Sequence, residues 1–151
     1  MQVATIRDHP YGRFVFQVDF GVGDPDSVDG GFEEVGPISA RIDVIEYRAG
    51  NDRVNTVRKI PGLHRVHDVT LKRGVIGSTT LFAWFQAGTR GQVDRRDVRI
   101  RLLNEDLSDV VFTWRLLRAW PVSYVVPALS ATSSDVAVEE LVLTCEGIDV
   151  E

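Results

Sequence analysis

Apolar residues recur at every second position in several runs of this chain. In residues 14–20, Phe14, Phe16, Val18 and Phe20 occupy alternate positions. Successive side chains of a β-strand point to opposite faces of the sheet, so this spacing puts the apolar residues on one face. The same alternation is present in residues 38–44, 98–102 and 110–116. It restricts the chain to a fold built mainly from half-buried strands.

Three further runs have strand character with an irregularity in each. Residues 66–73 predict a short strand that ends at Gly74. Residues 120–126 lie between two prolines, which is typical of an edge strand or a bend. In residues 136–145 the apolar positions change face, and a β-bulge at Glu139–Glu140 would explain the change. The runs at 98–102 and 110–116, joined by a turn, predict a hairpin.

One segment departs from the strand pattern. Ser78 and Thr79 offer an N-cap hydroxyl, no turn residue interrupts 81–86, and Gly88 suits a helix C-cap. We therefore expect one short helix at about 78–87, whose aromatic side chains plug the core of the sheet. With seven or eight strands and one helix, the expected fold is mainly β, an antiparallel sandwich or barrel-like fold.

Length and charge limit the classes of function. A chain of 151 residues suggests a single domain, 1–151. Its net charge of −5 argues against general binding of nucleic acid and against a polybasic membrane anchor. The N-terminus has no apolar signal-peptide core, and the lone Cys145 needs no oxidising compartment. The cytoplasm is therefore the expected place of folding.

Residues 48–62 fit neither periodicity and predict a long loop, with turn-forming residues and a closing Pro61–Gly62. Loops of this length in a compact domain usually carry function or lie at an interface. This one is basic in an acidic protein, which suits an acidic surface on a partner. A solvated charged loop is the alternative from composition alone.

Chemistry-bearing residues do not assemble into a catalytic pattern. His64, His67 and Asp68 form the one candidate acid–base or metal group, but positions 64 and 67 of a strand face opposite sides. There is no nucleophile elbow around a serine, and the glycine loop at 21–31 is acidic, which disfavours phosphate. We expect no enzyme activity, no metal and no cofactor.

Several short motifs, taken in order, resemble the tail tube proteins of contractile phage tails and of phage-tail-like injection systems. The resemblance begins at Phe14 and ends at Gly147, with Arg118 standing where the family commonly has Asn. The motifs are FVFQV at 14–18, GGFEEV at 30–35, EYRAGND at 46–52, KIPG at 59–62, VTLKRG at 69–74, RRDV at 95–98, AWP at 119–121 and VAVE at 136–139.

The resemblance implies a structural protein that forms hexameric rings, which stack into a hollow tube inside a contractile sheath. Its other implied partners are baseplate or first-ring tube proteins and a cargo of effector or DNA in the lumen, without specific nucleic-acid binding or membrane insertion. It implies assembly in the cytoplasm and membership of a particle that is released from the cell. The long loop is then expected to contact a neighbouring subunit or ring. The contact residues so implied are Arg48, Asn51, Asp52, Arg53, Arg58, Lys59, Pro61, Lys72 and Arg73.

Two other functions remain open on the residues. A monomeric β-barrel could bind a small ligand or glycan among Trp84, Trp114 and Trp120, although aromatic residues more often fill cores. An enzyme would have to use His64, His67 and Asp68. Self-assembly into rings or tubes would distinguish a tail tube subunit from both of these alternatives.

Overall fold

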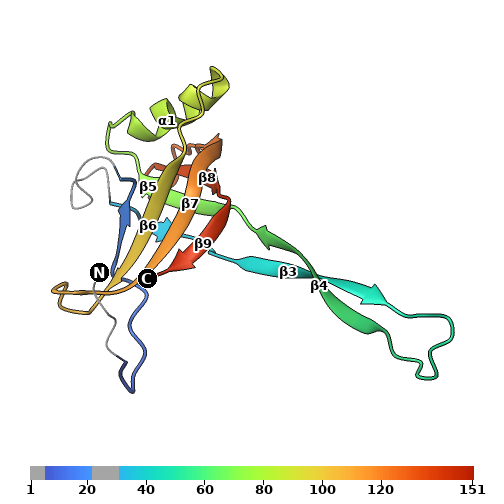
Figure 1. Cartoon of the computed structure of the whole chain (residues 1–151). Helices are drawn as coiled ribbons and strands as arrows, with labels where there is room; N and C mark the ends of the chain where they lie inside the picture. The colour runs from blue at the N-terminus through green and yellow to red at the C-terminus, as the bar shows by residue number, and fades with distance from the viewer. Residues whose placement is uncertain (1–5, 22–30) are drawn as a thin grey trace.

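The computed structural model describes residues 6–21 and 31–151, and most of the loop expected at 21–31, residues 22–30, lies outside them. Within the described residues the fold is mainly β with one helix, as predicted (Figure 1). The elements are β1 (Phe16–Asp19), β2 (Glu34–Val35), β3 (Ala40–Tyr47), β4 (Arg58–Val66), β5 (Val69–Gly74), α1 (Thr80–Thr89), β6 (Arg96–Leu103), β7 (Val110–Val125), β8 (Val138–Thr144) and β9 (Gly147–Val150).

Strand β7 organises the body of the molecule. Its first half pairs with β6 on one side and with β9 on the other, and its second half pairs with β8. The resulting antiparallel sheet of seven strands follows the order β1-β6-β7-β8-β5-β2, with β9 also on β7. The hairpin of β6 and β7 is confirmed. The separate strand expected at 120–126 is not, because β7 continues through Pro121, which pairs with Leu143 beside a register shift.

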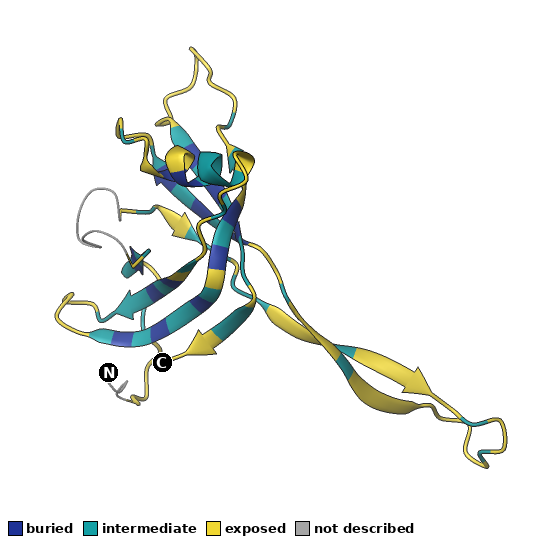
Figure 2. Ribbon diagram, turned by 45° about the horizontal axis from the view of Figure 1, so that its top comes forward, coloured by how far each residue is buried: buried dark blue, intermediate teal, exposed yellow. Residues whose placement is uncertain are grey.

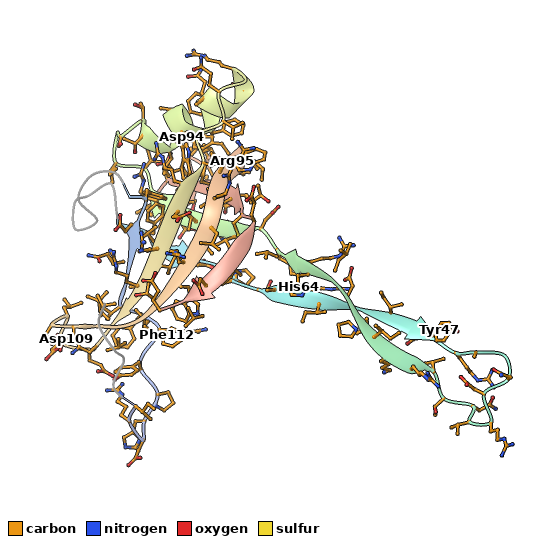
Figure 3. The ribbon with its side chains drawn as sticks, viewed as in Figure 1. Tyr47, His64, Asp94, Arg95, Asp109 and Phe112 are labelled. Atoms are coloured by element: carbon orange, nitrogen blue, oxygen red, sulfur yellow. The ribbon has the colours of Figure 1, made fainter. Side chains whose placement is uncertain are left out.

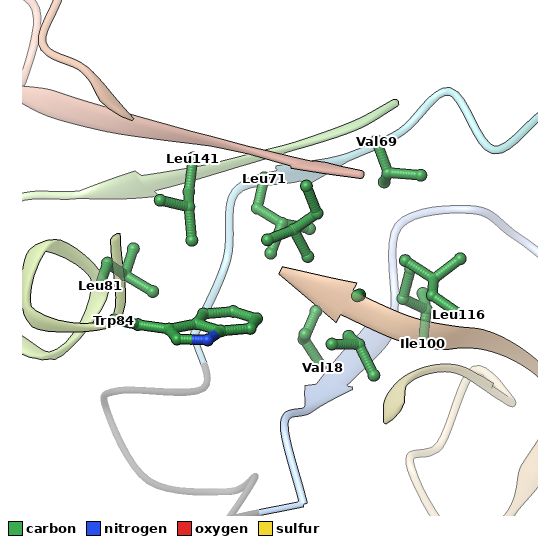
Figure 4. Close-up of a cluster of buried hydrophobic side chains, with 11 residues drawn as sticks. Val18, Val69, Leu71, Leu81, Trp84, Ile100, Leu116 and Leu141 are labelled. Carbon is green, nitrogen blue, oxygen red and sulfur yellow. The ribbon is translucent and has the colours of Figure 1, made fainter. Parts of the chain in front are cut away.

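The two halves of the sheet enclose the core together with the helix (Figure 4). Val18, Ile100 and Leu116 come from β1, β6 and β7, and Leu71 and Leu141 come from β5 and β8. On α1 the buried residues are Leu81 and Trp84. The Trp84 indole N–H donates to the carbonyl oxygen of Asp94 at 2.7 Å, so its polar group is satisfied inside the core. The expected aromatic plug is present in part, because Trp84 is buried and Phe85 packs against the core, whereas Phe82 is 42% exposed.

Helix α1 begins and ends two residues later than the 78–87 predicted. The Ser78 hydroxyl accepts a hydrogen bond from the Thr80 N–H just before the helix, so it lies outside the first turn. At the other end the helix passes through Gly88 and is terminated by Gly91, which has a φ of +79°. The N–H groups of Gly91 and Gln92 donate to the carbonyls of Gly88 and Ala87, the bond pattern of a Schellman cap.

The bulge predicted at Glu139–Glu140 is wrong. Strand β8 pairs with β5 in regular register from Val138 to Leu143, and Glu139, Leu141 and Leu143 share the buried face. The change in apolar pattern arises because a carboxylate occupies a core position. Its partner is Arg73, directly opposite on β5, with Nη2 of Arg73 2.7 Å from Oε1 of Glu139.

The long loop predicted at 48–62 is also corrected. Residues 58–62 belong to β4, which pairs with β3 in a separate two-stranded sheet, so the connection itself is only 48–57. Gly62 suits this ribbon because the side chain of Ile45 lies over it, 3.1 Å from where a Cβ would stand. Since β4 continues to Val66, the strand predicted at 66–73 is divided between β4 and β5.

A candidate self-assembly interface

The β3–β4 hairpin, residues 40–66, projects from the body as an exposed ribbon, which we call the arm (Figures 1 and 2). Exposed residues predominate along both of its strands. An isolated two-stranded ribbon is marginally stable in water, and extra strands or packing against another surface are needed to hold it. The arm is therefore the part of the described chain that most needs a partner surface.

One face of the arm is apolar at its middle. Cross-strand pairing puts Ile45 opposite Ile60, with Tyr47 two residues along on the same face, whereas Ile42 alternates onto the other face. The exposed fractions of the three side chains on the first face are 51% for Ile45, 53% for Tyr47 and 44% for Ile60. A contiguous apolar strip of this kind marks an interaction site in a soluble protein. We call Ile45, Tyr47 and Ile60 the apolar strip.

The same face carries ion pairs nearer the body. The Asp43 carboxylate, two residues from Ile45, lies between two arginines, 2.6 Å from Nε of Arg65 and 2.9 Å from Nη2 of Arg41. The hydrogen bond from Arg65, aided by that from Arg41, lowers the pKa of Asp43 below its ordinary value. On the other face Glu46 stands opposite Lys59. The apolar strip thus has charged residues next to it at the end nearer the body.

The tip of the arm is ordered by two of the residues expected at the interface. Arg48 donates from Nη2 to the carbonyl of Asp52 at 3.2 Å and from Nε to that of Val54 at 3.3 Å. The Asp52 carboxylate accepts from the N–H of Ala49 at 3.0 Å. Asn51 and Arg53 are exposed beside them. Arg48 and Asp52 therefore shape the tip, which leaves Asn51 and Arg53 to present side chains outward.

The expected contact residues fall into two groups. Those from Arg48 to Pro61 all lie on the arm or at its tip, whereas Lys72 and Arg73 lie on β5 in the body. Lys72 is at the surface, with its Nζ 3.6 Å from Glu34 and 3.7 Å from Glu140. Arg73 is 1% exposed and paired with Glu139, so its side chain supports the core rather than an interface.

The histidines and tryptophans of the alternative sites lie in different parts of the fold. His64 lies two residues before the end of β4 (Figure 3), while His67 and Asp68 occupy the link to β5, all three exposed. No group of three residues suited to hold a metal ion occurs in residues 6–21 and 31–151. Trp84 is buried against Phe20, whereas Trp114 packs on Phe112 with ring centroids 4.9 Å apart. In the same described part no helix is long and apolar enough to cross a bilayer.

The outer face of the β1-β6-β7-β9 region carries a ladder of ion pairs that crosses four strands. Arg101 contacts Asp19 at 3.0 Å, and Arg115 contacts Asp149 at 3.3 Å and Glu151 at 3.5 Å. Arg99 reaches Glu151 at 4.0 Å. We call these residues the charge ladder. Its three arginines and three carboxylates balance, so the charge ladder carries no net charge, and Nε of Arg115 is buried without a hydrogen-bond partner among the described residues.

An apolar groove of about 670 Å³ opens at one end of the core and was not predicted from the sequence. The alternation of apolar residues along the strands indicates that these side chains face inward, but not that the packed strands leave them half exposed. Phe14, in its lining, is 73% exposed, and the charged residues that line it are Arg13, Glu33 and Glu34. The apolar lining comes from Phe14, Phe16, Val35, Ile38, Ile100, Leu102 and Trp114.

Both a protein-family model and solved structures match this chain. The family model described as T4-like virus tail tube protein gp19 matches residues 12–149. The chain belongs to this tail tube family. A comparison with curated proteins gives no significant match.

Solved structures of tail tube type agree with the family. A chain in the PVC sheath–tube complex, an extracellular contractile injection system in its extended state, is 32% identical, with a TM-score of 0.82, and the match covers 95% of this chain and 93% of that one. A chain of the anti-feeding prophage cap, an AFP tube terminating cap, is 28% identical, also at 0.82, over 97% and 94% of the two chains.

A more distant likeness shows the fold alone. Hcp1 from Flavobacterium johnsoniae is 15% identical, with a TM-score of 0.54 over 91% of this chain and 94% of that one. Family and structural neighbours together identify a tail tube protein, a structural subunit of the inner tube of a contractile injection system rather than an enzyme.

Proposed function

We propose that this tail tube protein forms hexameric rings and that the rings stack into the conduit inside a contractile sheath. The observation that carries the proposal is the arm. It projects from the body with the three large side chains of the apolar strip about half exposed, and a free subunit would leave them in water. Contact with further copies removes that cost for every arm at once.

Charge supports contact between copies. The arm holds six basic and three acidic residues, a net charge of +3, in a chain whose net charge is −5. A basic arm and an acidic remainder attract each other between copies although two whole subunits repel at long range. Contact between two different surfaces is heterologous, and such contacts close into rings or continue into filaments. Both geometries occur in a stacked tube.

The charge ladder is the surface that we assign to the lumen. Its arginines and carboxylates are already paired with one another, although Nε of Arg115 has no hydrogen-bond partner among the described residues, so burying it in a subunit contact would cost solvation without new ion pairs. A wall without net charge also gives a charged cargo no strong attachment point.

The remaining partners follow from the same proposal. The sheath surrounds the tube, and baseplate or first-ring tube proteins begin it, in keeping with the sheath–tube and baseplate complexes in which the neighbours were solved. Effector or DNA cargo occupies the lumen. Assembly takes place in the cytoplasm, and the particle is then released.

Negative-stain electron microscopy of the concentrated protein tests the proposal. We expect six-fold rings or hollow tubes from the native chain, and small particles from Ile45→Ser/Ile60→Ser, which makes the apolar strip polar. Val125→Ser/Val126→Ser is the matched control, because these valines are 40% and 46% exposed and lie outside the arm. A native protein that stays monomeric and binds a ligand saturably would instead support the ligand-binding alternative.

A further inference from the structure

The apolar strip and the apolar groove lie in different parts of the same chain. Tyr47 is at the far end of the arm, while Phe112, whose ring packs on the groove residue Trp114, is on the body (Figure 3). No groove-lining residue belongs to the arm. A chain therefore cannot seat the outer half of its own arm in its own groove, although another copy can.

The two surfaces match in chemistry. The groove has seven apolar residues and a volume typical of a site that takes a few large side chains, and the apolar strip supplies Ile45, Ile60 and Tyr47. Burial of these side chains removes apolar surface from water and so favours the contact. Neither surface has another covering element within the described residues.

The charges at the edges of the two surfaces also match. Arg58 stands opposite Tyr47 on the same face of the arm and is 70% exposed, with Asp52 a distant 3.8 Å away. At the groove, Glu33 is exposed and makes no ion pair among the described residues, while Glu34 pairs with Lys72 at 3.6 Å. Arg13 also lines the groove, but the two carboxylates outnumber it, so a cation at the end of the apolar strip has Glu33 to meet there.

We propose that the apolar strip of one copy seats in the groove of the next copy, with Arg58 against Glu33. This inference rests on the proposed function and names the surface that receives the arm. The contact is heterologous, because each copy contributes its arm to one neighbour and its groove to another. It therefore propagates around a ring instead of stopping at a dimer.

Cross-linking in assembled material tests the contact. In a Cys145→Ala background we would introduce Ile45→Cys and Phe14→Cys together and treat purified tubes with a short bis-maleimide. We expect a ladder of covalent multimers, with about tenfold more product than from the control pair Ile45→Cys/Val125→Cys, because thiols held in contact react at a high effective concentration. Val125 is exposed like Phe14 but lies outside the groove.

The outcomes separate this inference from the proposed function. Tubes that form without covalent multimers from the Ile45–Phe14 pair would support the proposed function and contradict the contact between the apolar strip and the groove. A dimer from Phe14→Cys alone would show that two grooves face each other and would also reject it. Failure of the Cys145→Ala parent and of the native chain to form rings would overturn both proposals.

A charge exchange provides an independent test. We expect Arg58→Glu to lower the yield of tubes severalfold and Glu33→Arg to do the same, whereas the double variant restores it. Arg90→Glu is the control, since Arg90 is an exposed arginine after α1, outside the arm. Loss of assembly in the double variant equal to that in the singles, with native melting, would refute the Arg58–Glu33 contact.

Discussion

At the scale of single residues, Arg73 and Glu139 show how a charge is accommodated inside this small core. The two side chains are 1% and 5% exposed and lie directly opposite on β5 and β8. Glu139 also accepts a hydrogen bond from the Tyr124 hydroxyl. Since a slip of either strand would separate the charges, the pair fixes the register of β5 against β8.

Removing one partner of this pair should be far more damaging than removing both. We expect Glu139→Ala to lower the free energy of unfolding by about 3–5 kcal/mol, because a buried arginine loses its counter-charge. Arg73→Met/Glu139→Leu should recover most of the loss. Urea denaturation of the three proteins measures the difference. A double variant no more stable than Glu139→Ala would contradict the pairing argument.

Tyr124 should give the protein a stability change at high pH. Its hydrogen bond to Glu139, with burial and the nearby carboxylate charge, raises the pKa of Tyr124 to about 12 from 10.0. A raised pKa means that the neutral phenol stabilises the fold fully below pH 10 and that this contribution is lost as the pH rises through about 12. We expect Tyr124→Phe to cost about 1–2 kcal/mol at neutral pH and to flatten the decline above pH 10. Chemical denaturation across that range compares the two proteins.

Arg118 has a left-handed backbone conformation, which is unfavourable for most residues that carry a Cβ. Its φ is +50°, beside the register shift between β6 and β7, where its N–H donates to Asp97. A non-glycine residue in the left-handed region costs about 1–2 kcal/mol, and Asn tolerates that region best. We expect Arg118→Asn to raise the free energy of unfolding by about 0.5–1 kcal/mol, despite loss of an exposed ion pair with Glu146. Arg118→Val should lower it, as thermal melting would show.

At the scale of elements, periodicity predicted most strands, and it failed at residues whose type suggests a different structure from the one they form. The hairpin of β6 and β7 followed from clean alternation. The arm did not, because Gly62 and Pro61 are signals for a turn, and only the Ile45 side chain lying over Gly62 makes them suitable for a ribbon. Glu139 misled in the same way, since its partner is 66 residues distant in the sequence.

Gly62 therefore offers a test of the arm by itself. A Cβ there would lie 3.0 Å from the Asp43 carbonyl oxygen and 3.1 Å from Cγ1 of Ile45. We expect Gly62→Val to displace Ile45 from the apolar strip and to reduce tube formation while leaving the melting temperature of the body within experimental error. Gly50→Ala is the control, because nothing lies within 4 Å of its added Cβ. Equal assembly of the two variants would argue against the arm as a contact.

At the scale of the whole molecule, the sequence predicted what class of protein this is better than where its surfaces lie. Ordered motifs indicated the tail tube family, and the family match confirms it. The same resemblance implied the contact residues, of which all but Lys72 and Arg73 lie on the arm, and they stay a prediction. Arg73 shows the limit of that reasoning, because a short basic motif does not reveal which of its side chains points inward.

The body should fold without the arm. Arg41 and Arg65 are directly paired, so an Asn-Gly turn between them can replace residues 42–64. We expect this shortened protein to keep the circular dichroism spectrum of a folded β protein and to run as a monomer in size-exclusion chromatography with light scattering. A shortened protein that is unfolded would show that the arm supports the body, and one that still forms tubes would overturn its role in assembly.

The separate pairing of β3 with β4 has a consequence for how such proteins diversify. The arm forms its own two-stranded sheet, and the seven-stranded sheet holds the body. Substitutions in one can therefore accumulate with little effect on the other. A lineage can alter which neighbours its subunit accepts by changing one cassette of sequence, while inheriting an unchanged folding unit. Exchange of that cassette between related subunits is then a short evolutionary step, and also a practical route to subunits with a chosen order along a particle.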